Sequence, residues 1–231
     1  MRIVLKISGE SLKGDQNISN NSLEKVLREI KEIKKENELI IVVGGGNFWR
    51  GRNQLDIDDS TSDYIGMLAT DMNALAISSY LSKNNINNRC YSAFEVCGVI
   101  EKLPTKNIIE QLKDNVVILG GGTGLPGFST DMTTINAAVT YNADLILMSK
   151  NIDGIYDKDP REEGAKKIDQ MTHEELFNMS LKQGTNSLLV MDLEAMSALV
   201  KHKIPIYLYS NNRINTIDDV INGKEGTKVI S

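Results

Sequence analysis

The chain has 231 residues and a formal net charge of −5, and 41% of its residues are hydrophobic and 25% charged. This composition is typical of a globular protein and argues against a disordered or fibrous chain. An acidic chain lacks the basic face of a general nucleic-acid or membrane-surface binder, so we expect no nucleic acid and no membrane as partner. The length permits one sizeable α/β domain, which we expect to span residues 1–231.

The expected location of the protein follows from its N-terminal segment and its cysteines. A strand begins almost at once, with Arg2 and Lys6 around a short apolar run, and no stretch approaches the roughly 18 apolar residues of a membrane span. The spacing of Cys90 and Cys97 fits no common zinc or redox motif, so we interpret both as free thiols. We expect a cytoplasmic protein.

Apolar runs and helical periodicities alternate along the chain. The expected strands are 3–7, 39–43, 89–93, 97–100, 116–119, 144–148, 205–209 and 227–230, and the expected helices are 20–36, 60–83, 106–113, 131–142 and 190–203. In the first helix, apolar residues recur at spacings of three and four from Leu23 to Ile33. This alternation predicts an α/β fold, a three-layer α/β/α sandwich with a mainly parallel central sheet.

Three expected strands end in glycine-rich segments, which we name the first, second and third glycine loops. They are residues 8–11 (Ser-Gly-Glu-Ser), 44–47 (Gly-Gly-Gly-Asn) and 120–124 (Gly-Gly-Gly-Thr-Gly). Glycine lets the backbone approach a ligand closely and direct amide N–H groups at oxyanions. Ligands of parallel sheets bind outside the carboxyl ends of the strands, where all three loops lie. With Lys6 before the first loop and Arg50 after the second, they indicate a substrate that carries several phosphates.

Two common nucleotide-binding motifs are absent. Residues 46–53 lack the Lys and the Ser/Thr of the P-loop, and the first glycine loop lacks the spacing G-x-G-x-x-G. A tight β–α turn remains the alternative for each loop alone, but the second and third loops contain more glycines than a turn needs. His173 and His202 lie late in the chain, and we interpret both as surface or structural residues.

The order of these motifs resembles that of bacterial uridylate kinases, in the amino-acid-kinase superfamily. The similar segments are Lys6–Glu10, Gly44–Asn47 with Arg50-Gly51, Asp63–Thr70, Gly122–Asp131, Asp153–Pro160, Val190–Leu193 and Gly223–Thr227. They cover essentially the whole chain. The resemblance implies the amino-acid-kinase fold and transfer of the γ-phosphoryl group of MgATP to UMP, which gives UDP and ADP.

The resemblance further implies a catalytic set of Lys6, Arg50 and Asp131. Lys6 would reach the β- and γ-phosphates as a mobile charge, and Arg50 would clamp the UMP phosphate through its planar guanidinium. Asp131 would orient Lys6 or cap the next helix, and both roles can hold at once. Because the acceptor is an ionised phosphate oxygen, no general base is needed. Mg²⁺ is expected to enter with ATP, with phosphates and water as most of its ligands.

Two nucleotide sites are implied in the same way. The ATP site comprises Lys6, Ile7, Ser8, Gly9, Gly46, Arg50, Asn151, Tyr156 and Asp159. The UMP site comprises Gly45, Asp63, Thr123, Gly124, Leu125, Pro126, Gly127, Phe128, Ser129 and Thr130. Asp63 would accept hydrogen bonds from the ribose hydroxyls, and a first-turn carboxylate favoured by the helix dipole is the alternative. Lys150 is a less favoured candidate for a second phosphate lysine, and Asp192 has either a functional or a capping role.

Departures from the family pattern bear on specificity and regulation. Relatives usually carry Asn-Pro-Tyr or Asn-Pro-Phe where this chain has Leu125-Pro126-Gly127, so discrimination between pyrimidine nucleotides is open. Residues 13–17 are shorter than a glycine-rich loop tied to GTP activation in some relatives, so we expect GTP activation to be weak or absent. UTP is expected to inhibit. The resemblance also implies a homohexamer. The residues themselves show no signal for an oligomer beyond the apolar helix 64–81, for which a place in the core is the alternative.

Two other functions stay open. A superfamily member of another branch, such as an acetylglutamate or carbamate kinase, phosphorylates a small acceptor that has no ribose for Asp63 to bind. A non-catalytic nucleotide sensor or storage protein on the same fold has no need for Lys6, Arg50 and Asp131 together. UMP phosphorylation is therefore the function that we expect.

Overall fold

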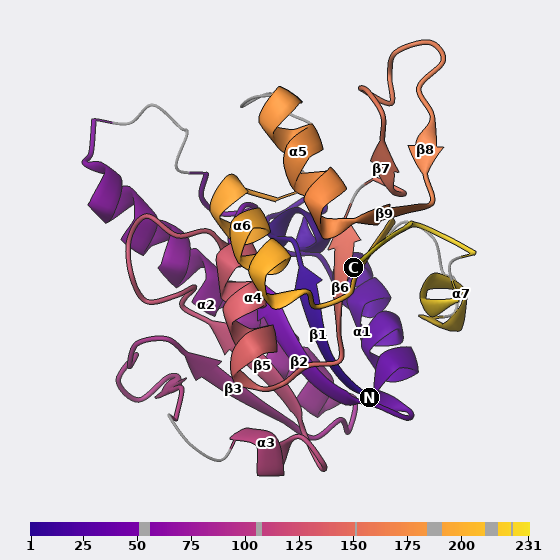
Figure 1. Cartoon of the computed structure of the whole chain (residues 1–231). Coiled ribbons are helices and arrows are strands. Elements are labelled where there is room, and N and C mark those ends of the chain that lie inside the picture. Colours follow the sequence, from indigo (N-terminus) through magenta and orange to yellow (C-terminus); the bar gives the residue numbers. More distant parts are fainter. Residues whose placement is uncertain (51–55, 105–107, 151, 184–190, 211–216, 223) are drawn as a thin grey trace.

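The computed structural model describes residues 1–50, 56–104, 108–150, 152–183, 191–210, 217–222 and 224–231. Across these residues the central sheet has nine strands in the order β4-β3-β5-β2-β1-β6-β10-β11-β9 (Figure 1). Its strands are β1 (Arg2–Ile7), β2 (Glu38–Val43), β3 (Asn88–Ser92), β4 (Glu101–Lys102), β5 (Val116–Gly120), β6 (Leu145–Lys150), β9 (Gln170–Thr172), β10 (Ile206–Ser210) and β11 (Thr227–Ile230). Only β10 and β11 pair antiparallel among these strands. The expected mainly parallel sheet is confirmed.

Alternate side chains of β1 enter two different cores. Ile3 and Leu5 pack into the core on one face of the sheet, and Val4 packs into the core on the other. A strand that is covered on both faces needs apolar side chains at nearly every position. Lys6 interrupts the run at the carboxyl end of β1, and by alternation its side chain shares the face of Val4.

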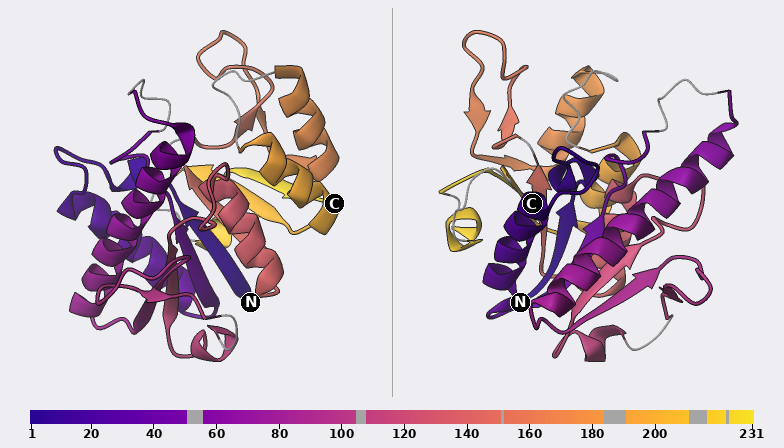
Figure 2. Two further views of the ribbon diagram at one scale, coloured as in Figure 1. Left: turned by 90° about the vertical axis from the view of Figure 1, so that its left-hand side faces the viewer. Right: turned by 180° about the vertical axis from the view of Figure 1, so that it is seen from behind.

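Three helices cover the face of Ile3. They are α1 (Asn20–Lys34), α2 (Asp59–Lys83) and α7 (Ile217–Ile221), and they lie together on one side of the sheet in Figure 2. The helix starts are capped, because the side chains of Ser19 and Asp58 accept hydrogen bonds from the backbone N–H groups of Ser22 and Thr61. The capping residue fixes where α2 begins, and so places Asp63 on its second turn.

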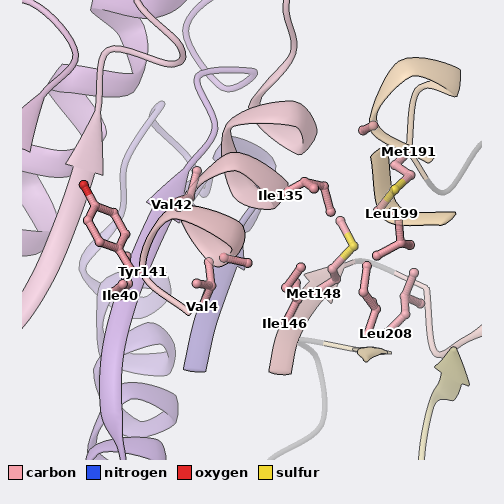
Figure 3. Packing of buried hydrophobic residues seen from close by; sticks show 14 of the residues in the cluster. Val4, Ile40, Val42, Ile135, Tyr141, Ile146, Met148, Met191, Leu199 and Leu208 are labelled. Atoms are coloured by element: carbon pink, nitrogen blue, oxygen red, sulfur yellow. The ribbon is translucent and has the colours of Figure 1, made fainter. Parts of the chain in front are cut away.

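The opposite face of the sheet carries α4 (Thr130–Thr140), α6 (Leu193–His202), α5 (His173–Gln183) and the short α3 (Ile108–Gln111). Figure 3 shows Ile135 of α4 and Leu199 of α6 packed over Met148 of β6 and Leu208 of β10. This packing holds the start of α4 next to the carboxyl end of β1, where Asp131 faces Lys6.

Most differences from the expected elements concern short segments. The strand expected at 97–100 is wrong, because Val96 and Ile100 bridge across a turn and β4 follows at Glu101. Several short elements were not predicted: β9, α5, α7, the 3₁₀ helix η1 (Gly9–Leu12) and the hairpin of β7 (Ile155–Tyr156) and β8 (Lys167–Ile168). These segments are too short or too charged for an apolar period to stand out. Among the described helices, none has the length and apolar character needed to cross a membrane.

Candidate active site

The three glycine loops meet at one edge of the sheet. Ile7 lies opposite Val43 and Val42 lies opposite Leu119 in the parallel register, so the carboxyl ends of β1, β2 and β5 lie side by side. Ser149 of β6 lies opposite Ile7 on the other side of β1. These ends point upward in Figure 1, toward α5 and the β7–β8 hairpin. A Cβ atom at Gly9 would lie 2.6 Å from the amide nitrogen of Gly46, so the first and second loops touch backbone to backbone.

Lys6 and Asp131 form a nearly buried ion pair at this edge. The Nζ atom of Lys6 lies 2.6 Å from Oδ1 of Asp131, and their side chains are 9% and 13% exposed. Burial opposes ionisation of Asp131, but the ammonium groups of Lys6 and Lys150 outweigh burial and lower the pKa of this carboxyl. The structure therefore brings together two of the three residues that the sequence analysis named as catalytic. The capping role considered for Asp131 is wrong, because Ser129 is the N-cap of α4 and Asp131 lies in the first turn.

Lys150 joins this pair from the end of β6. Burial lowers the pKa of Lys150 to about 8, with an opposing contribution from Asp131 and a further lowering by Lys6. Two ammonium groups, those of Lys6 and Lys150, thus lie near the carboxylates of Asp131 and Asp192, and ammonium groups suit the binding of a phosphate chain. Lys150 was a less favoured candidate from the sequence, and the register that places Ser149 opposite Ile7 is what brings it to the site.

The second glycine loop is held by a pair of buried amides. Nδ2 of Asn47 donates to Oδ1 of Asn73 at 2.9 Å, and Nδ2 of Asn73 donates to Oδ1 of Asn47 at 2.7 Å and to the carbonyl of Gly44 at 2.7 Å. A Cβ atom at Gly45 would lie 2.8 Å from the carbonyl oxygen of Gly66. The loop therefore packs directly on α2, an anchor that the sequence analysis missed.

Arg50, which follows the second loop, reaches toward the first. Its Nη2 donates to Oε1 of Glu10 at 2.7 Å, and its side chain is 62% exposed. An exposed ion pair of this kind is weak and exchanges easily for a phosphate. The structure thus pairs Arg50 with Glu10 of the first glycine loop, whereas Asp131 pairs with Lys6. Gly51, which belongs to the same motif, lies outside the described residues.

The third glycine loop continues into the segment predicted to bind UMP. Oγ1 of Thr123 accepts a 3.2 Å hydrogen bond from the amide of Leu125, which makes a local turn. The amide of Gly127 donates to Oδ2 of Asp63 at 2.6 Å, so this segment meets the second turn of α2. Leu125 and Phe128 are 61% and 45% exposed. Both apolar side chains are therefore exposed.

Ser129 links the start of α4 to the start of α6. Its side chain accepts from the amides of Asp131 and Met132 as the N-cap of α4, and it donates a short hydrogen bond to Oδ2 of Asp192. Asp192 in turn caps α6 by accepting from the amide of Ala195 at 2.8 Å. The capping role of Asp192 is confirmed, and its bond to Ser129 brings α6 to the edge of the site.

Comparison with known proteins agrees with this geometry. The model of the amino acid kinase family matches residues 1–210. The chain belongs to the amino acid kinase family. A uridylate kinase of Aster yellows witches'-broom phytoplasma is 40% identical and one of Limosilactobacillus reuteri 39%; the alignments cover 100% and 99% of this chain and 97% and 96% of those chains. The crystal structure of UMP kinase from Ureaplasma parvum has a TM-score of 0.87 and 34% identity, over 100% of this chain and 98% of that one.

The residues predicted to bind ATP on this amino acid kinase fold are partly described. The hydroxyl of Tyr156 donates to Oδ1 of Asp153 at 3.0 Å at the base of the β7–β8 hairpin. Hydrogen bonds from Arg161 lower the pKa of the Asp159 carboxyl to about 2. Asn151 lies outside the described residues. His173 is buried with Nε2 2.9 Å from the carbonyl of Ile204, so its role is structural.

A metal ion would find few protein ligands at this edge. No group of three His, Cys, Asp or Glu side chains among the described residues is placed to hold a metal ion. The carboxylate of Asp131 is engaged by Lys6, and that of Asp192 by Ser129. This donor set fits Mg²⁺ that arrives with nucleotide phosphates, because that ion keeps most of its waters and needs only one or two carboxylates.

Proposed function

We propose that this amino acid kinase transfers the γ-phosphoryl group of MgATP to UMP and gives UDP and ADP. The observation that carries the proposal is full-length similarity to uridylate kinases, at 40% and 39% identity. The buried Lys6–Asp131 pair, with Lys150 beside it, supports it because phosphoryl transfer needs fixed positive charge where the three glycine loops meet.

Positioning and charge neutralisation explain the reaction. An oxygen of the UMP phosphate attacks the γ-phosphorus, and the bond from that phosphorus to the bridging oxygen of ADP breaks. The acceptor oxygen is already ionised at neutral pH, so no side chain removes a proton. The ammonium group of Lys6, held by Asp131, stabilises the negative charge that develops on the transferring phosphoryl group. Lys150 adds a second positive charge nearby. Mg²⁺, when bound with ATP, neutralises further phosphate charge.

The acceptor side of the proposed site combines the second and third glycine loops. Arg50 exchanges Glu10 for the UMP phosphate, and Asp63 accepts from the ribose hydroxyls. The remaining acceptor contacts are Gly45, Thr123, Gly124, Leu125, Pro126, Gly127, Phe128, Ser129 and Thr130. The proposed ATP side comprises Ile7, Ser8, Gly9, Gly46, Asn151, Tyr156 and Asp159, with Lys6 and Arg50 between the two nucleotides.

A coupled ADP-release assay with MgATP and a panel of acceptors tests the proposal. The panel contains UMP, CMP, dUMP, AMP and GMP, with acetylglutamate and carbamate as acceptors of other branches. We expect the highest kcat/KM for UMP. Turnover of a carboxylate or carbamate instead would assign the chain to another branch, and nucleotide binding without turnover would make it a sensor.

Location, assembly and regulation complete the proposal. We propose a cytoplasmic homohexamer that UTP inhibits by competing for the uridine contacts. GTP activation is proposed to be weak or absent, because the shortened loop at residues 13–17 has little reach across a subunit interface, and an effector acts only through different affinities for two states. Initial rates at subsaturating ATP, with and without GTP, test this, and several-fold activation would contradict it.

A further inference from the structure

A buried carboxyl that the proposed reaction does not use lies beneath the third glycine loop. Asp71 on α2 is 4% exposed, and its Oδ2 accepts a 3.1 Å hydrogen bond from the hydroxyl of Ser92. Its Oδ1 is buried and has no hydrogen-bond partner within the described part of the chain. Burial raises the pKa of Asp71 to about 6. Burial of a carboxyl that accepts only one hydrogen bond lowers the stability of the fold. Residues that lower stability in this way are often retained for function.

Asp71 and Ser92 fill the space that side chains of the third loop would otherwise take. A Cβ atom at Gly120 would lie 2.3 Å from Oδ1 of Asp71, and one at Gly121 would lie 2.4 Å from Oγ of Ser92. Gly120 therefore has no room for a side chain while Asp71 keeps this position. At Gly121 the φ angle of +72° and a distance of 2.6 Å from the Cβ position to the backbone nitrogen of Ala93 add to the contact with Ser92. Glycine at these two positions thus has a second reason in the packing, besides the close approach of phosphates expected from the sequence.

The same contacts extend into the segment that binds the acceptor in the proposed site. Thr70, next to Asp71 on α2, accepts a 2.8 Å hydrogen bond from the amide of Gly121. Ala93, next to Ser92, packs against Gly124, where a Cβ atom would lie 3.1 Å from its methyl group. The third glycine loop therefore contacts both α2, through Thr70, and the residue directly after β3, Ala93.

A cavity of about 270 Å³ opens beside these contacts. Ser92, Ala93, Gly122, Thr123 and Thr133 contribute to its lining. Two of these residues, Gly122 and Thr123, belong to the third glycine loop itself. A shift of Ser92 would therefore change the wall of the cavity and the conformation of the loop together.

We propose that Asp71 is a positioning residue for the acceptor nucleotide, and that it fixes the third glycine loop through Ser92. The inference rests on the proposed function and deepens its acceptor side. Asp71 touches no reacting group, so it acts on the affinity for UMP and leaves ATP binding unaffected. For this role Asp71 needs only the oxygen that accepts the hydrogen bond from the hydroxyl of Ser92.

Steady-state kinetics of four variants test this role, with UMP and ATP varied in turn. Asp71→Val and Ser92→Ala each remove one side of the hydrogen bond, and the double variant removes both. Asp71→Asn keeps an acceptor oxygen and the size of the side chain. We expect each of the first two to raise the KM for UMP about tenfold and the KM for ATP less than about twofold. The double variant should match the larger single effect, and Asp71→Asn should stay within about twofold of wild type.

Ser78→Ala is the matched control. The hydroxyl of Ser78 donates to Oδ1 of Asn88 at 2.6 Å, so it also bridges α2 and β3, but at the end away from the loop. It should change neither KM. An unchanged KM for UMP in Asp71→Val, parallel rises for both substrates, or additive effects in the double variant would overturn the inference.

Two outcomes separate this inference from the proposed function. Absence of UMP turnover by the wild type contradicts the proposed function alone, and the same variants are then measured with whichever acceptor the panel identifies. If Asp71→Val does not fold, Ser92→Ala and Asp71→Asn decide the question. A normal acceptor KM in Ser92→Ala would then overturn the role of Asp71.

Discussion

The amide of Gly127 donates a 2.6 Å hydrogen bond to the carboxylate of Asp63, although the two residues are 64 positions apart. This bond ties the acceptor segment to α2. Gly127 has a φ angle of +87°, which an L side chain rarely adopts, and a Cβ atom there would have no atom within 4 Å. One backbone contact therefore orients both the carboxylate that we propose for the ribose and the segment that we propose for the base.

The first prediction concerns that contact. Gly127→Ala adds a methyl group in open space, so its main effect is the cost of the left-handed backbone, about 1–2 kcal/mol. We expect the loop to shift and the affinity for UMP to fall about tenfold. Titration with UMP followed by the fluorescence of Trp49, the one tryptophan of the chain, measures this.

Gly98→Ala is the control for this prediction. Gly98 has a φ angle of +72° and equally open surroundings, and it lies in the turn before β4, away from the glycine loops. It should lose a similar amount of stability and retain UMP affinity. Equal UMP affinities for the two variants would show that the Gly127 contact has no part in acceptor binding.

A second prediction is that Asp63→Asn weakens UMP binding more than ATP binding. Asp63 faces the proposed ribose position, and loss of a charged acceptor costs about 1.5–3 kcal/mol. Kinetics with each substrate varied would measure the two KM values. Equal rises in both values, or no rise, would contradict the assignment of Asp63 to the ribose.

The third prediction is that Lys6→Ala lowers kcat far more than it raises either KM. The ammonium group of Lys6 is held by Asp131, so it is already placed for charge that develops on the transferring phosphoryl group. Interactions that strengthen only in the transition state appear in kcat. A kcat within a few-fold of wild type would make Lys6 a structural partner of Asp131.

The sequence predicted the edge of the sheet on which the candidate site lies, because parallel strands have a simple signature. Runs of apolar residues that end in glycine placed the three loops at one edge, and Lys6 lies at the end of one such run, directly before the first loop. Asp131 followed from the same motif order. These are local features, each carried by a single strand end or helix start.

Residues whose roles depend on register or on distant pairing were harder to predict. Lys150 becomes a member of the site only when β6 pairs with β1, and Glu10 only when η1 faces Arg50. The Asn47–Asn73 pair joins a loop to a helix 26 residues away. The hydrophobic periodicity of a sequence does not predict such contacts, because each contact depends on how two elements pack against each other.

The fourth prediction concerns stability and pH at Asp71. Its pKa is raised from 3.8 to about 6 in the folded chain. The folded state therefore binds the proton of Asp71 more tightly than the unfolded state does. The protonated carboxyl contributes its full stabilisation below about pH 4, and this stabilisation is lost as the pH rises through about 6. Asp71→Asn removes this titration.

The free energy of unfolding of Asp71→Asn should rise relative to wild type between about pH 4 and about pH 7, by roughly 3 kcal/mol. Urea unfolding of both proteins at a series of pH values measures the difference. A difference that stays constant with pH would show that Asp71 titrates normally and that the carboxyl reaches water.

The last prediction uses Lys150, whose pKa is lowered to about 8 by burial. If a protonated Lys150 helps to bind the phosphates of ATP, kcat/KM for ATP must fall as the pH rises through about 8, since this ratio reports the free enzyme. Lys150→Arg keeps a positive charge at every accessible pH, because a guanidinium does not deprotonate. Its kcat/KM should therefore stay level where that of the wild type declines, even if its absolute value is lower. Lys150→Met, which has no charge, should be low and level over the same range. A decline that persists in Lys150→Arg would assign the titration to another group and leave Lys150 without a role in ATP binding.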